Sequence, residues 1–177
     1  MQSMPANYWR RRKHLRYYTD ALAFARKLAP HAATLLDVGT GPTMYLSAAE
    51  GYSDIAAVDI KFWPEWDTWP DHISKIISPF EHMLPIESDV VLCLQTLEHI
   101  SPDIRDAFVA KLFACAKQVL VVSIPYKWSN AKTPNHDGLD QSTLDEWMGR
   151  TPSSYIVSTE TTGHMRLISG YVCDNDH

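Results

Sequence analysis

The feature that most constrains the fold is a short apolar run that ends in an acidic residue and a glycine turn. Residues 34–38 read Thr-Leu-Leu-Asp-Val, and Gly39-Thr40-Gly41 follows directly. Glycines at the end of a buried strand let a ligand lie against the backbone, because they carry no side chain. Ligands of open α/β sheets bind at the carboxyl ends of the strands. The turn at 39–41 therefore predicts a central strand that leads into a binding site.

The rest of the chain alternates strand-like and helix-like segments. Further strands are predicted at 54–60, 73–77, 90–95 and 119–124, and a terminal hairpin at 155–162 and 165–173. Helices are predicted at 18–28, 42–49, 102–115 and 143–148, the last with Ser142 as its cap. This alternation predicts an α/β fold: a doubly wound, mainly parallel seven-stranded sheet with a C-terminal antiparallel hairpin.

Segment 61–72 is rich in proline and aromatic residues, so a loop or a broken helix is expected there. Its tryptophans, Trp63, Trp66 and Trp69, recur every three residues. That spacing places them on one helical face. They are expected to pack in the core, with a partner surface or a cover over an aromatic ligand as alternatives.

Composition and charge narrow the function classes. The longest apolar runs, such as 119–124, are far shorter than the roughly 20 residues that cross a bilayer, so no membrane span is expected. The start of the chain lacks the apolar stretch of a secretory signal, which makes a cytoplasmic location the default expectation. The three cysteines are widely spaced and odd in number, so we expect reduced packing residues rather than disulfides.

The formal net charge of −5 provides no global attraction to nucleic acid. A local exception is the basic strip at 10–16, which reads Arg-Arg-Arg-Lys-His-Leu-Arg. One interpretation is a solvated helix face, as charged runs usually are. The other is a strip beside the active site that binds phosphate or acidic groups.

Two residues refine the kind of ligand that the glycine turn predicts. A dinucleotide fingerprint continues as GxGxxG, but Met44 occupies the position of the third glycine. Asp59 ends the second strand about twenty residues after the turn, where a carboxylate accepts hydrogen bonds from ribose hydroxyls. Together these residues favour an adenosyl ligand that carries a methionyl group in place of a pyrophosphate. The ammonium group of such a ligand suits the nearby Asp37.

Three segments in order carry a family resemblance. They are Leu-Leu-Asp-Val-Gly-Thr-Gly at 35–41, Ala-Val-Asp-Ile at 57–60 and Asp-Val-Val-Leu-Cys-Leu-Gln-Thr-Leu-Glu-His-Ile at 89–100. From about residue 34 to the terminal hairpin, the chain resembles the class I S-adenosylmethionine-dependent methyltransferases, in particular small bacterial methyltransferase-domain proteins. The resemblance implies a Rossmann-like methyltransferase fold and S-adenosyl-L-methionine as the cofactor.

The resemblance also implies roles for individual residues. Asp37, Gly39, Thr40 and Gly41 would surround the methionine end of the cofactor, and Asp59 with Ile60 would hold the ribose. Gln95, Leu97 and Glu98 would lie near the cofactor and the acceptor cleft. Many family members carry an acid after the third strand that contacts adenine, but Pro79 takes its place here. Adenine would then be held by a backbone group, by Phe80 or by the hydroxyl of Ser78.

One domain is expected over residues 1–177, because the chain is long enough for one core and short for two. Within it we expect an N-terminal helical segment at 1–30 and a cofactor-binding core at 34–126. Residues 127–177 would supply an acceptor-side loop, the short helix and the hairpin.

Histidine is the first candidate for a general base, because its usual pKa lies near neutrality. His136, with Asp137 beside it to orient the ring, is the preferred base, and His99 is a second candidate. Structural roles stay open for both: His99 as a packing residue on the next helix, and His136 as an ordinary loop residue. Tyr126 and Trp128 follow the fifth strand and are expected to line the acceptor side. No metal is expected, because His136, Asp137 and Asp140 match no strong ligand pattern.

The sequence thus predicts an enzyme that methylates a small-molecule acceptor, with a sugar or another biosynthetic hydroxyl as the leading class. One alternative is a non-catalytic cofactor-binding or regulatory protein of the same fold, favoured by Pro79. Another is a nucleic-acid or protein methyltransferase that docks through the basic strip at 10–16. The expected partner is the small-molecule acceptor; neither a membrane nor nucleic acid is expected, and a homodimer stays open.

Overall fold

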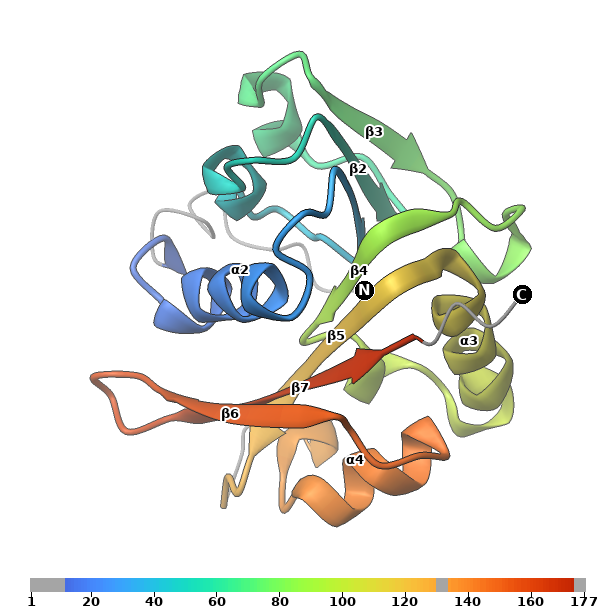
Figure 1. Ribbon diagram of the computed structural model, residues 1–177. Coiled ribbons are helices and arrows are strands. Elements are labelled where there is room, and N and C mark those ends of the chain that lie inside the picture. Colours follow the sequence, from blue (N-terminus) through green and yellow to red (C-terminus); the bar gives the residue numbers. More distant parts are fainter. Residues whose placement is uncertain (1–11, 130–133, 174–177) are drawn as a thin grey trace.

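The computed structural model describes residues 12–129 and 134–173, which form a sheet with helices on both faces (Figure 1). The sheet has the strand order β3-β2-β1-β4-β5-β7-β6. Its strands are β1 (Thr34–Val38), β2 (Asp54–Asp59), β3 (Ile73–Ile77), β4 (Ser88–Leu94), β5 (Ala116–Tyr126), β6 (Ser154–Thr159) and β7 (Met165–Val172). The α-helices of the described residues are α2 (Arg16–Leu28), α3 (Pro102–Cys115) and α4 (Gln141–Met148).

The predicted topology is confirmed. Strands β1 to β5 pair in parallel, whereas β7 runs antiparallel to both β5 and β6. The chain enters the sheet at its centre, builds outwards to β3 and then crosses to β4 on the other side of β1. A crevice forms where the winding reverses, at the carboxyl ends of β1 and β4. The final hairpin closes the opposite edge of the sheet (Figure 1).

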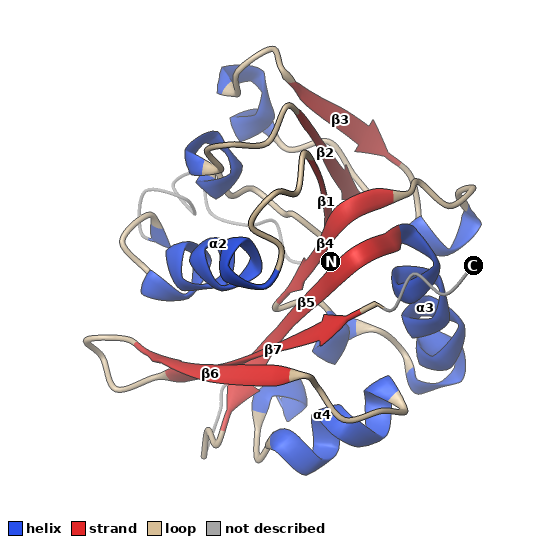
Figure 2. Cartoon of the chain, in the orientation of Figure 1, coloured by secondary structure: helices blue, strands red, loops and turns tan. Residues whose placement is uncertain are grey.

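Strand residues alternate between two apolar cores, one on each face of the sheet. In β1, Leu35 belongs to the core beneath α2, and Leu36 belongs to the core beneath α3 and α4. Figure 2 shows α2 on one side of the strands and α3 and α4 on the other. The α2 side also contains Trp63, Trp66 and Trp69, so their predicted role as core residues is confirmed.

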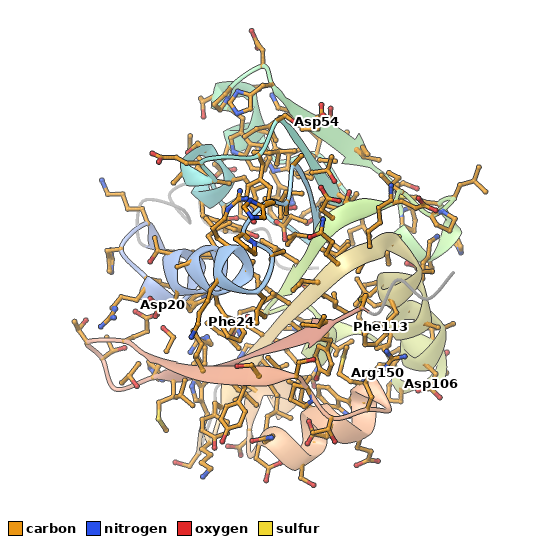
Figure 3. The ribbon with its side chains drawn as sticks, in the orientation of Figure 1. Asp20, Phe24, Asp54, Asp106, Phe113 and Arg150 are labelled. Carbon is orange, nitrogen blue, oxygen red and sulfur yellow. The ribbon has the colours of Figure 1, made fainter. Side chains whose placement is uncertain are left out.

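The outer helices are joined to the rest of the fold by surface contacts as well as by apolar packing. Arg150 follows α4, and its guanidinium lies 3.8 Å from the centroid of the Phe113 ring on α3, which Figure 3 shows as neighbouring side chains. Such a cation–π contact adds to the apolar packing beneath these helices. Ile104, in the first turn of α3, is 38% exposed.

Two predicted helices differ from the structure. Segment 42–49 contains only a 3-10 turn, Tyr45–Ala48, because the hydroxyls of Thr43 and Ser47 donate to carbonyls three residues earlier and compete with an α-helix. The first crossover is therefore a loop rather than a helix. The cap of α4 is Asp140 rather than Ser142: its Oδ1 accepts from the Thr143 backbone N–H at 2.9 Å. Segment 61–72 holds a 3-10 turn, Pro64–Thr68, in line with the predicted broken helix.

The N-terminal basic strip is partly visible. Arg10 and Arg11 lie outside the described residues, while Lys13, His14 and Arg16 are exposed. Within the described parts of the chain, no helix has both the length and the apolar character needed to span a membrane.

Helix α2 is held against the terminal hairpin by a buried carboxylate. Glu160, which follows β6, is 5% exposed and accepts hydrogen bonds from the backbone N–H groups of Arg16 and Tyr17. These are two of the N–H groups that a helix start leaves without a partner inside the helix. Asp20, labelled on α2 in Figure 3, accepts from the Ser158 hydroxyl at 2.6 Å. The hairpin therefore positions Tyr18, which lines the cavity described below.

We predict that Glu160→Ala lowers the free energy of unfolding by about 1–3 kcal/mol, because it leaves buried N–H groups without an acceptor. Glu160→Gln keeps one acceptor oxygen and should lose less. Urea unfolding followed by circular dichroism measures both, with the exposed Glu146→Ala as the control. Equal stability of Glu160→Ala and the control would contradict this role.

Candidate functional site

A cavity of about 360 Å³ opens at the carboxyl ends of β1, β2 and β4. Such a volume lies within the usual range for small-molecule sites. Most of its lining comes from the loops that follow these strands. Its lining residues include Asp37, Gly39, Thr40, Gly41, Asp59, Ile60, Phe80, Gln95 and His99.

The glycine turn forms the floor of this cavity. Gly39 and Gly41 both have positive φ angles, 77° and 63°, which glycine adopts at little cost. The Gly39 N–H donates to the Val58 carbonyl, and the Thr96 hydroxyl donates to the Gly39 carbonyl. The Trp66 indole N–H donates to the Gly41 carbonyl at 2.9 Å. The turn is therefore fixed by β2, β4 and the tryptophan segment together.

Asp37 is the buried acid of the cavity. It is 1% exposed, and its Oδ2 makes no hydrogen bond within the described residues. Burial raises the pKa of Asp37 to about 7, although the Thr40 and Tyr45 side chains oppose the rise; Asp59 adds to it. An ionised carboxylate without a partner in such a place favours a cationic ligand.

Asp59 joins the ends of β1 and β2. Its Oδ2 accepts from the Gly41 N–H at 2.7 Å, and its Oδ1 is 3.4 Å from the Lys61 backbone nitrogen. Oδ1 therefore keeps most of its capacity to accept from a ligand hydroxyl. Ile60, the next residue, is 62% exposed and lines the cavity, so it offers an apolar surface beside the carboxylate.

The loop after β3 closes one end of the cavity. Ser78 and Phe80 line it, and the Phe80 ring packs edge-on against Phe108 at 5.1 Å between centroids. Glu81, two residues after Pro79, is exposed and also lines this end. An acid is thus present two residues after Pro79, which occupies the position of the expected adenine-binding acid. The sequence motif did not indicate this acid.

A further part of the cavity lining comes from the segment after β4. Gln95 has a φ of 55°, a left-handed conformation that non-glycine residues seldom adopt and that often marks functional sites. Its amide donates to the Ser123 hydroxyl at 3.2 Å. His99 and Ile104 also line the cavity, which explains the exposure of Ile104.

His99 connects the cavity to a second group of polar side chains. Its Nε2 lies 3.4 Å from the Nε2 of His136, which in turn lies 3.9 Å from Oε1 of Glu98. Burial raises the pKa of Glu98 to about 8, although Arg166 opposes the rise. Burial also lowers the pKa of His136 to about 4, with contributions from His99 and from nearby arginines.

Six predicted site residues do not line the cavity: Leu97, Glu98, Tyr126, Trp128, His136 and Asp137. Leu97 is fully buried in the core beneath α3. Tyr126 packs at the edge of the same core, and the Trp128 indole donates to the Met165 carbonyl while its ring packs against His136. Asp137 was predicted to orient His136, but its side chain is exposed and its backbone pairs with Trp128. Glu98, rather than Asp137, is the acid next to the His136 ring.

Sequence comparison gives no match, either to a protein-family model or to a curated protein. By structure, the chain is similar to 1,6-didemethyltoxoflavin-N1-methyltransferase from Burkholderia thailandensis, solved with 1,6-didemethyltoxoflavin and S-adenosylhomocysteine. The TM-score is 0.75 and the identity 17%, over 90% of this chain and 79% of that one. It is also similar to the N-methyltransferase NodS from Bradyrhizobium japonicum WM9, solved with S-adenosylhomocysteine (TM-score 0.75, 10% identity, 97% and 94% covered).

A third similar structure is magnesium protoporphyrin IX methyltransferase from Synechocystis PCC 6803 with bound S-adenosylhomocysteine (TM-score 0.70, 15% identity, 97% and 89% covered). The chain has the fold of the S-adenosylmethionine-dependent methyltransferases. The fold that the sequence resemblance implied is thereby confirmed. In this methyltransferase fold, the cavity lies at the reversal of strand order, between the ends of β1 and β4.

Sequence reasoning missed several residues of the methyltransferase-fold cavity. Tyr18 comes from α2, which precedes the glycine turn in sequence, and Tyr45 comes from the turn that replaces the predicted helix. Both lie at the buried side of the cavity, and their rings stack at 4.7 Å between centroids. Tyr18 begins the helix predicted at 18–28, and nothing in the sequence indicated that it would line a cavity.

The glycines of the turn allow a matched test. A Cβ on Gly39 would lie 2.4 Å from the Thr96 side chain, whereas a Cβ on Gly41 would meet nothing within 4 Å. Both substitutions carry the cost of a positive φ, about 1–2 kcal/mol. We predict that Gly39→Ala lowers the free energy of unfolding by about 1–3 kcal/mol more than Gly41→Ala, because of this clash. Equilibrium urea unfolding of the two variants measures the difference; equal losses would show that the contact with Thr96 is relaxed easily.

Proposed function

We propose that the chain is an S-adenosylmethionine-dependent methyltransferase that holds the cofactor in the cavity at the ends of β1, β2 and β4. The observation that carries the proposal is the buried Asp37, whose Oδ2 has no hydrogen-bond partner among the described residues and lies next to a double glycine turn. A cationic ligand at that point offsets the cost of burying the carboxylate. S-Adenosylmethionine carries two cationic groups, a sulfonium and an ammonium, at its methionine end.

The remaining lining residues suit the other parts of the cofactor. Asp59 Oδ1 accepts from a ribose hydroxyl, while Oδ2 keeps the glycine turn in place. Ile60 and Phe80 provide apolar surfaces for the adenine ring. The carboxylate of Glu81 accepts from the adenine amino group. It takes over the role of the acid that many methyltransferases carry at the position of Pro79. The adenine ring therefore keeps an acidic partner although Pro79 replaces the usual acid.

The acceptor enters at the end of the cavity formed by Gln95, His99 and Ile104. When bound, S-adenosylmethionine supplies a methyl group that an acceptor oxygen takes by in-line displacement, as the electron pair of the carbon–sulfur bond passes to sulfur and the hydroxyl proton is released. The chain contributes by holding the acceptor oxygen at attack distance and by excluding water. Gln95 and His99 provide polar atoms at this end, and His136 lies behind His99.

A small molecule is the acceptor class that the cavity favours. The negative net charge of the chain opposes docking of nucleic acid. Two proteins with a similar fold are named for small acceptors, 1,6-didemethyltoxoflavin and magnesium protoporphyrin IX. Because these acceptors differ in size and chemistry, the fold leaves the acceptor open. A hydroxyl compound such as a sugar fits the polar end formed by Gln95 and His99.

The buried acid predicts a pH-dependent affinity for the cofactor. In the unliganded chain, Asp37 has a pKa of about 7, so it is mostly protonated at pH 5.5 and half ionised at pH 7. A cationic ligand favours the ionised form, so the affinity should rise about tenfold between pH 5.5 and 7. Tyr45 also faces Asp37, but burial raises its pKa, so it stays neutral over this range.

Calorimetric titration with S-adenosylhomocysteine and with S-adenosylmethionine across this pH range tests the prediction. Asp37→Asn is the control, and it should bind more weakly with little pH dependence. Absence of cofactor binding at every pH would overturn the methyltransferase proposal and favour a protein that keeps the fold without the activity.

A second experiment separates the cofactor end from the acceptor end. Asp59→Ala should weaken cofactor binding at least about tenfold, because it removes both a charge-assisted hydrogen bond and the anchor of Gly41. Asp59→Asn keeps an acceptor for the Gly41 N–H and should lose less. His136→Ala should leave cofactor affinity within about twofold but lower turnover, measured as S-adenosylhomocysteine released with a panel of sugars and other hydroxyl compounds. Equal loss of affinity in Asp59→Ala and His136→Ala would contradict this division.

A further inference from the structure

Three potential metal ligands from two separate loops, Glu98, His99 and His136, meet beside the cavity, which His99 lines. Glu98 and His99 lie in the 3-10 turn Leu97–His99 after β4, and His136 lies in the 3-10 turn Pro134–His136 after β5. One donor atom from each residue lies within 4.8 Å of the other two. Because β4 and β5 are adjacent parallel strands, their following loops meet at the same edge of the sheet.

Glu98 is the most informative member of this cluster. The residue is 2% exposed, and neither carboxylate oxygen has a hydrogen-bond partner within the described chain. The nearby cation, Arg166, lies over the Trp128 ring at 4.3 Å and donates to the Met165 carbonyl. Buried carboxylates are normally paired, hydrogen-bonded or bound to a metal. Glu98 is buried next to two imidazole rings, and its oxygens make no hydrogen bond within the described residues. This arrangement points to a missing ligand.

We propose that Glu98, His99 and His136 bind a divalent metal ion, with Zn²⁺ as the ion that best suits the donors. Two imidazoles and one carboxylate form a ligand set found in catalytic zinc sites, which keep a fourth position for water or substrate. Zinc ligands at about 2.0–2.1 Å and tetrahedral angles are about 3.3–3.4 Å apart. The two Nε2 atoms are 3.4 Å apart, and the contact of His136 with Glu98 is 3.9 Å.

The surroundings of His136 hold its ring in place for such a role. The Trp128 ring packs edge-on against His136 at 5.6 Å between centroids, and its indole N–H is fixed by the Met165 carbonyl. The backbone of Gly138 donates to the Trp128 carbonyl at 2.8 Å, which ties the loop that carries His136 to the end of β5. Fixed orientation of metal-binding histidines by neighbouring groups is typical of metal sites. Trp128 is therefore a positioning residue rather than a substrate contact.

The metal ion would act on the acceptor, and this role rests on the proposed methyltransferase function. His99 belongs both to the cluster and to the cavity lining, so the open coordination position adjoins the acceptor end. An acceptor hydroxyl bound to the metal loses its proton to water more readily. The oxygen then forms the bond to the methyl carbon, the carbon–sulfur electron pair passes to sulfur, and the products are a methyl ether, S-adenosylhomocysteine and one proton. The site thus favours an acceptor with an oxygen that can bind a metal.

Metal titration of the chelator-treated full chain tests the site without an acceptor. Zn²⁺ is followed by calorimetry and Co²⁺ by its visible absorption, and each should bind with one equivalent per chain. Glu98→Gln and His99→Ala should each weaken binding at least about tenfold. The matched control is His164→Ala, an exposed histidine whose ring packs against Trp128 at 4.4 Å outside the cluster, and it should bind like the unaltered chain.

Several outcomes would overturn the metal site. They are no binding by the unaltered chain, the same affinity in all variants, or a thiolate charge-transfer band with Co²⁺ that places the ion on a cysteine. Circular dichroism shows whether each variant is folded, and His99→Ala is the safer variant because His99 is exposed. Cofactor titration of the metal-free chain distinguishes the two proposals. Cofactor binding without metal binding would overturn only the proposed metal site. Metal binding without cofactor binding would overturn the proposed methyltransferase function.

Discussion

The hydrogen bond from the Gly41 N–H to Asp59 Oδ2 is the interaction on which the cavity depends. It joins the loops after β1 and β2 at 2.7 Å and sets the path of the backbone over the buried Asp37. The Trp66 indole fixes the carbonyl of the same glycine, so both polar backbone groups of Gly41 are engaged and its side-chain position faces open space. The tryptophan segment, which was expected to pack in the core, thus also supports the binding turn directly.

The buried carboxyl group of Asp37 lowers the stability of the fold at this turn when it is ionised. Burial raises its pKa from 3.8 to about 7, so over this interval the native chain binds a proton that the unfolded chain releases. Its contribution to stability therefore falls as the pH rises from about 4 to 7 and is constant above that. A cationic ligand reverses the penalty, because it favours the ionised form in the native state alone. The burial that makes the ionised Asp37 unfavourable in the native chain thus also favours a cationic ligand beside it.

Sequence reasoning succeeded where strand ends define the chemistry and failed where loops do. Asp37 and Asp59 were placed correctly at one cavity, because parallel strands bring their carboxyl ends together. The helix predicted at 42–49 was wrong, since apolar spacing does not reveal that Thr43 and Ser47 bond to nearby carbonyls. The contact of His99 with His136 spans 37 residues and depends on how two irregular loops fold over β4 and β5. No local ligand pattern could therefore have identified it.

Left-handed backbone conformations follow several strands of the sheet, but glycines adopt them after β1 and larger residues adopt them after β4 and β5. At the proposed cofactor end, Gly39 and Gly41 adopt positive φ angles at little cost. Among the described residues other than glycine, Gln95 and Lys127 are left-handed; they follow β4 and β5, and the conformation costs about 1–2 kcal/mol each. Their N–H groups donate to the Ser123 and Leu139 carbonyls, which compensates for the strain. Both residues precede the segments that carry Glu98, His99 and His136, so the strained backbone lies next to the proposed metal site.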